Sequence, residues 1–221
     1  SLAQQKVIRQ RLRELETPGQ EPFPYRFNYV TNLLRMAKPA DALQALEGAL
    51  DRARQTGNPH AIRQTLLLTG SAFLELGRWD EATAALNETA KLAAAGTGNE
   101  NAQAQIEALR ARLNISRGNI DAARRHSDAA LKFAGYRTKN PLRSLARVLL
   151  VAAEISLAKG AGTDAERFAS DALAISESVA RGPDTSADVG EALLRLAQAR
   201  ITANLGADTT HILERAVRCL T

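Results

Sequence analysis

The side chains that could do catalytic chemistry are few and far apart in this sequence. The three histidines, His60, His126 and His211, stand in separate stretches of the chain, and no motif surrounds any of them. Nucleophilic catalysis needs a Ser, Cys or Thr beside an oriented base, and a metal site needs ligands grouped at ligand spacing. Neither pattern occurs, and a Gly-rich phosphate-binding loop is also missing. We therefore expect no enzyme, no cofactor and no metal, and interpret each histidine as a surface residue of a helix.

The single cysteine excludes an internal disulfide and a zinc cluster of several thiolates. We expect Cys219 to be partly exposed, because it falls outside the apolar stripe of the C-terminal segment, which consists of Ile212, Leu213, Ala216, Val217 and Leu220. On this interpretation His211, Glu214, Arg215 and Arg218 face water while the stripe seals the end of the fold.

No signal peptide and no apolar run of about 18 residues is present, so we expect a soluble fragment without a membrane segment. The sequence begins at Ser1 without an initiator methionine, which suggests a piece of a longer protein. A reducing compartment, the cytoplasm, fits the use of only one cysteine.

The formal net charge is +5 and the sequence pI is about 9.7, which raises the question of a nucleic-acid partner. Lysines and arginines are, however, scattered along nearly every segment and interleaved with Glu and Asp, and the few aromatic residues form no stacking pair. Such charge is more typical of a solvated surface. We therefore consider nucleic acid an unlikely partner; an RNA-binding array, the alternative, would bind oligonucleotides in a strongly salt-dependent way.

The elements that would have to position any functional residue are helices. Alanine is abundant and aromatic residues make up only 4% of the chain, a composition that favours closely packed helices over a β-sandwich. Asn58-Pro59 and Asn140-Pro141 each place a capping amide before a proline at the first helical position. The sequence predicts an all-α fold with helices over 2–16, 24–36, 39–56, 59–76, 79–94, 99–117, 119–134, 141–159, 163–180, 185–205 and 207–219.

Small residues recur with a period of about 40 residues. One column consists of Ala42, Ala82, Ala123 and Ala165, at intervals of 40, 41 and 42, and a second lies seven residues further on, at Ala49, Thr89, Ala130 and Ala172. Turn glycines precede each second helix at Gly77, Gly118 and Gly160, while Ala37 takes that place in the first unit. In the last unit Gly206 fits the turn, but His211 then stands where a small residue is expected. The period predicts stacked helical hairpins.

The most complete unit runs from Gly70 to Ala82, with the sequence GSAFLELGRWDEA. It resembles the signature of tetratricopeptide repeats (TPRs), and the longer period resembles the extended-helix subtype found in kinesin light chain and in bacterial signalling arrays. The resemblance implies an α-α superhelix, or solenoid, of about 10–11 helices in one domain. We expect an N-terminal helix and linker at 1–23, followed by hairpins at 24–57, 58–97, 98–137, 138–182 and 183–221.

In TPR arrays the first helices of the hairpins line a concave groove that binds partners. Counting six residues back from each turn residue places one polar residue per repeat at the same level: Thr31, Ser71, Arg112, Glu154 and Arg200. Neighbouring levels are largely apolar and supply a hydrophobic floor of Leu67, Leu68, Leu109, Leu150 and Val151. These ten residues are the predicted partner-binding groove. The residues with which chaperone-binding TPRs clamp a terminal carboxylate are missing.

We predict a protein-interaction scaffold whose groove binds a peptide or partner protein, with acidic residues on the ligand because Arg112 and Arg200 flank Glu154. An alternative stays open: a sensory or regulatory region of a larger bacterial signalling protein, such as a serine/threonine kinase or a transcription regulator. A surplus of Arg over Lys and the frequent alanines suggest a GC-rich bacterium. The sequence leaves the oligomeric state open.

Overall fold

The computed structural model describes residues 23–94, 100–138, 144–205 and 209–220, and within these ranges it contains helices and no strand. The helix predicted at 2–16 lies outside the described residues. The chain clusters into two compact units, Ser1–Thr97 and Gly98–Thr221, which we call unit 1 and unit 2 and describe separately. Whether the hairpins form one continuous array stays a prediction.

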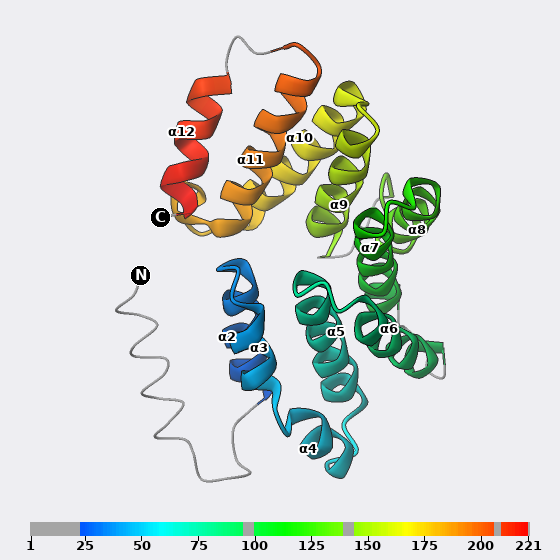
Figure 1. Ribbon diagram of the computed structural model, residues 1–221. Coiled ribbons are helices and arrows are strands. Elements are labelled where there is room, and N and C mark those ends of the chain that lie inside the picture. Colours follow the sequence, from blue (N-terminus) through cyan, green and yellow to red (C-terminus); the bar gives the residue numbers. More distant parts are fainter. Residues whose placement is uncertain (1–22, 95–99, 139–143, 206–208, 221) are drawn as a thin grey trace. The chain divides into compact units, whose positions relative to one another are not determined.

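Unit 1 contains α2 (Phe23–Arg35), α3 (Pro39–Leu46), α4 (Ala49–Gln55), α5 (Pro59–Glu75) and α6 (Trp79–Ala94) (Figure 1). Helix α5 begins as predicted: Pro59 is its first residue, and the Asn58 side chain accepts a hydrogen bond from the Ala61 amide at 3.1 Å. First helices α2 and α5 are in contact.

One predicted helix of unit 1 is broken. The prediction joined 39–56, but Gly48 has a φ of +66° and Glu47 an extended ψ of 130°, so α3 ends at Leu46 and α4 begins at Ala49. A left-handed residue cannot continue a right-handed helix, and glycine adopts this conformation without a steric cost. Both small positions that flank the break, Ala42 and Ala49, are still fully buried.

Unit 2 contains α7 (Glu100–Ser116), α8 (Ile120–Phe133), α9 (Leu145–Ala158), α10 (Gly162–Val179), a 3-10 turn η1 (Pro183–Thr185), α11 (Ala187–Thr202) and α12 (Thr209–Leu220) (Figure 1). Each helix packs against its hairpin partner, and the first helices also touch in sequence, α7 on α9 and α9 on α11. The start predicted for α9 lies outside the described residues, and the other predicted helix ends of this unit agree with the observed ones to within three residues.

Both predicted columns of small residues are buried. The eight residues are all 0% exposed: Ala42, Ala82, Ala123, Ala165, Ala49, Thr89, Ala130 and Ala172. Small side chains allow helix axes to come within about 8 Å. The repeat pattern therefore reports real packing positions, in each unit by itself.

The register of the last hairpin differs from the prediction. The left-handed turn residue that ends α11 is Asn204, with a φ of +57°, whereas Gly206 lies outside the described residues. Counting from Asn204, the small positions are Thr209 and Ala216, which are 7% and 2% exposed. The mismatch at His211 thus came from choosing the glycine as the turn, although asparagine also tolerates this conformation.

Helix α12 buries only part of the predicted apolar stripe, namely Ile212 and Ala216. Ile212, Ala216 and Cys219 face the core of unit 2, and Cys219, expected to be exposed, is 6% exposed. Leu213, Val217 and Leu220, expected to be buried, are 36%, 58% and 51% exposed. The apolar arc of this helix is wide, so its amphipathicity alone did not decide which part would pack inward.

Polar contacts tie α12 to α10 and to the connection that precedes α11. Arg215, which we expected to face water, pairs with Glu177 of α10 at 2.7 Å and with Asp184 of η1 at 3.0 Å. The Cys219 thiol donates to the Pro183 carbonyl at 3.4 Å. Together with the buried face, these contacts fix the orientation of the terminal helix.

Candidate functional site: the first-helix face of unit 2

The first helices of the three hairpins in unit 2 bring charged side chains together. We call the surface made by α7, α9 and α11 the first-helix face. On it, Glu154 of α9 lies between two arginines: its Oε2 is 3.7 Å from Arg112 Nε of α7 and 3.9 Å from Arg195 Nη2 of α11. Arg195 also donates from Nη1 to the Gln198 side-chain oxygen at 3.0 Å.

These three residues, Arg112, Glu154 and Arg195, form what we call the charged cluster. Their side chains are 32%, 28% and 28% exposed, so each is held by its neighbours and still reaches solvent. Both N–O distances exceed the range of a direct hydrogen bond, so these contacts are loose ion pairs. With two guanidiniums around one carboxylate, the cluster carries a formal net charge of +1.

The predicted polar column is only partly brought together. Arg112 and Glu154 lie on adjacent helices in the predicted order. Arg200 does not join them: its Nε donates to Glu166 Oε1 of the second helix α10 at 2.9 Å. Because the turn residue is Asn204, the residue six positions before the turn is Gln198 and not Arg200. The residue of α11 that lies beside Glu154 is Arg195, three positions before Gln198.

The two hydroxyl residues of the column lie in unit 1 and are engaged by their own helices. The Thr31 hydroxyl donates to the Phe27 carbonyl at 2.8 Å, and the Ser71 hydroxyl donates to the Leu67 carbonyl at 2.9 Å. A hydroxyl whose proton is used in this way can only accept a further hydrogen bond. Thr31 and Ser71 therefore offer little to a ligand that needs a donor.

The residues of the predicted hydrophobic floor are mostly core residues. Four are nearly inaccessible, at 4–7% exposure: Leu67, Leu68, Leu150 and Val151. Only Leu109 of α7 is half-buried. A ligand on the first-helix face would meet the charged cluster and the edge of Leu109 rather than a broad apolar surface.

Sequence reasoning missed Arg195 and Gln198. The signal that could have found them was the pair Thr209 and Ala216, which continue both small-residue columns once Asn204 is taken as the turn. A second ionic group links the helices of one hairpin: Glu107 of α7 accepts from Arg110 at 2.8 Å and lies 2.6 Å from His126 Nδ1 of α8.

No group of three or more metal-ligating side chains occurs within the ranges that the structure describes. In the same ranges no helix is long and apolar enough to cross a membrane.

Comparison with known proteins defines the class of fold. No protein-family model matches the sequence, and no curated protein matches it. Among solved structures, BtubC from P. vanneervenii aligns with a TM-score of 0.59 and 19% identity, covering 89% of this chain and 78% of that one. The TPR-like repeats of a putative kinesin light chain from Podosopora anserina align with a TM-score of 0.52 and 14% identity, covering 88% and 92%.

These similarities confirm the predicted TPR-like fold of antiparallel helical hairpins. The second of these neighbours is described as a putative kinesin light chain, the group whose repeats the sequence resembles. The fold is one of helical repeat proteins. At this level of identity the likeness extends to the fold alone.

Proposed function

We propose that the chain is a protein-interaction module and that the first-helix face of unit 2 binds an acidic segment of a partner protein. The observation that carries this proposal is the charged cluster, in which three successive first helices place Arg112, Glu154 and Arg195 side by side. Charged residues at an interface mainly set partner choice and register, and guanidiniums pair well with carboxylates.

The geometry of the cluster supports a ligand carboxylate rather than a ligand cation. Glu154 Oε2 lies 3.7 Å from Arg112 Nε and 3.9 Å from Arg195 Nη2, so neither of these two contacts is a direct hydrogen bond. An incoming carboxylate can make shorter, charge-assisted bonds, which are worth about 1.5–3 kcal/mol each. Half-buried Leu109, on the same helix as Arg112, offers a contact for an apolar residue next to the acidic one.

The experiment uses a random peptide library displayed on phage and selected on the whole chain. Enriched peptides should carry Asp or Glu beside an apolar residue, and their affinities are then measured by fluorescence anisotropy. Arg112→Glu and Arg195→Glu should each weaken binding about 10- to 100-fold, as for a charged hydrogen bond replaced by repulsion. Arg200→Glu is the matched control, because it makes the same charge change on α11 at a similar exposure but pairs with α10.

Equal losses in all three variants would mean that net charge, not the cluster, drives binding. Enriched peptides without acidic residues, or affinities unaffected by Arg112→Glu and Arg195→Glu, would contradict the proposal. The same assay with a single-stranded oligonucleotide tests the nucleic-acid alternative, for which all three reversals should weaken binding and salt should abolish it.

A further inference from the structure

The exposed apolar face of α12 occupies a place that is buried or partly buried in the other hairpins of unit 2. Relative to the first small position of each second helix, Leu213, Val217 and Leu220 stand four, eight and eleven residues further on. The same three positions are Ser127, Leu131 and Ala134 on α8, and Ala169, Leu173 and Ser176 on α10.

Those internal positions are covered by the first helix of the following hairpin. Leu131 and Ala134 share a core cluster with residues of α9, and Ala169 shares one with Val189 and Leu193 of α11. On α12 the equivalent residues are 36–58% exposed. The face made by Leu213, Val217 and Leu220 therefore corresponds to a surface that packs against a helix in the other hairpins of unit 2.

The residue types on α12 nevertheless depart from the repeat. The position occupied by Leu220 is small in each preceding second helix: Ala53, Ala93, Ala134 and Ser176, all 0–3% exposed. Small residues there let the next first helix come close, whereas a leucine pushes the helix axes toward about 10 Å. The face thus fits a helix held at a wider, coiled-coil-like distance better than another hairpin stacked in register.

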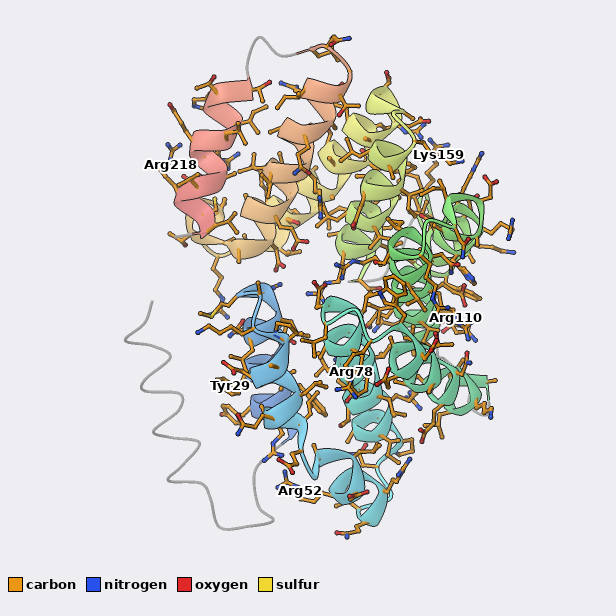
Figure 2. All side chains as sticks on the ribbon, in the orientation of Figure 1. Tyr29, Arg52, Arg78, Arg110, Lys159 and Arg218 are labelled. Atoms are coloured by element: carbon orange, nitrogen blue, oxygen red, sulfur yellow. The ribbon has the colours of Figure 1, made fainter. Side chains whose placement is uncertain are left out.

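Charge decides which helix fits. Glu214 and Arg218 are exposed, lie one turn apart and flank the same side of this apolar face. Arg218 projects from α12 away from the rest of unit 2 (Figure 2). When two copies of one helix pair antiparallel about a two-fold axis, residues on the same flank face each other. Glu214 of each copy then lies opposite Arg218 of the other, which makes the surface self-complementary in both apolarity and charge.

We propose that α12 is a self-association surface, through which two copies of this chain pair antiparallel with Leu213, Val217 and Leu220 at the centre and two reciprocal Glu214–Arg218 ion pairs at one side. The opposite face of the helix stays packed on α11, because Ile212, Ala216 and Cys219 are at most 9% exposed. Cys219 therefore takes no part, and the dimer needs no disulfide.

Sedimentation equilibrium of the whole chain with a reducing agent tests this pairing. A monomer–dimer equilibrium is expected, with a dissociation constant on the order of micromolar to hundreds of micromolar for so small a contact. Glu214→Arg and Arg218→Glu should each raise the dissociation constant about tenfold, because each turns two attractive pairs into two repulsive ones. The double variant restores both pairs in swapped form and should dimerise like the wild type.

Arg124→Glu is the matched control, since Arg124 pairs with Asp128 one turn away on the exposed side of α8 at 3.8 Å, and it should leave association unchanged. A chain that stays monomeric up to about 1 mM would overturn the proposal and leave the face to a different occupant, such as further chain or another protein. A dimer that is unaffected by the single variants, or that the double variant fails to restore, would also overturn it.

Discussion

Replacing Gly190 with alanine should loosen the packing of α12 on α11. A Cβ at this position would lie 2.8 Å from the Cys219 Cβ and 2.8 Å from the Leu220 Cγ. Cβ atoms essentially never approach so closely, and the Cys219 Cβ is attached directly to the helix backbone. The added methyl group can therefore be accommodated only if α12 moves.

The magnitude follows from two opposing terms. Overpacking of a tight contact costs about 1–3 kcal/mol, while replacing glycine with alanine inside a helix gains about 1 kcal/mol. The net destabilisation of unit 2 is thus about 0–2 kcal/mol, or up to a few degrees in melting temperature for a chain of this length. The matched control is Gly70→Ala in α5, where the nearest atoms to the new Cβ, on Ala85 and Leu86, are 3.6 Å away. There only the helix term applies, and unit 1 should gain about 0.5–1 kcal/mol.

Two probes separate the units. The only tryptophan, Trp79, reports on unit 1 by fluorescence, and the reaction of the buried thiol of Cys219, the only cysteine, with an aromatic disulfide reagent reports on the opening of α12. In Gly190→Ala the thiol should react faster while the urea midpoint of Trp79 fluorescence is unchanged; in Gly70→Ala that midpoint should rise. A Gly190→Ala variant with wild-type thiol reactivity would refute the close approach of α11 and α12.

Three further outcomes follow from the structure. Ala123→Leu should destabilise unit 2 by about 1–3 kcal/mol, because Ala123 is fully buried between helices, and an unchanged melting temperature would show that the small-residue column does not mark a tight contact. Burial, followed by the hydrogen bond to Asp171 of α10 at 2.7 Å, raises the pKa of Tyr136. The neutral tyrosine therefore contributes stability that is fully present below the ordinary tyrosine pKa and is lost as the pH rises through the raised pKa. Tyr136→Phe should remove this alkaline loss of stability, and an identical alkaline decline of the melting temperature in the variant and the wild type would contradict the prediction. Backbone amides of α9, which is flanked by hairpin and neighbouring helices, should exchange more slowly than those of α12, and hydrogen exchange with equal protection in the two helices would contradict the stacking order in unit 2.

Much of the fold could be predicted from the sequence because its two strongest signals are local. Small residues at a spacing of seven mark the buried side of each second helix, and Gly77, Gly118 and Gly160, all with positive φ, mark the turns. The predicted helix ends were wrong where the left-handed backbone conformation falls on a residue that the repeat pattern did not mark as a turn. Asn204 ends α11 in place of a glycine, and Gly48 interrupts a helix whose small positions are otherwise in phase.

The candidate site was less predictable, because it depends on distances between helices. The level count placed Arg112 and Glu154 at one level, and their side chains lie 3.7 Å apart. In the last hairpin an error of two residues in the turn placed Arg200 at the level that Gln198 occupies, and Arg195, which lies beside Glu154, was missed. The floor leucines could not be assigned from the sequence, since a leucine on a first helix can line a groove or lie under the next hairpin. Burial of Leu150 and Val151 in the core of unit 2 favours the second interpretation.

The most direct test of the proposed binding surface is a hydrogen-exchange footprint of the whole chain with a peptide enriched by the library selection. Binding to the charged cluster should slow exchange in the segments of α7, α9 and α11 around Arg112, Glu154 and Arg195, and leave α8 and α10 unchanged. Slowed exchange in α8, α10 or α12, with none in the three first helices, would contradict the proposal that the first-helix face of unit 2 binds the partner.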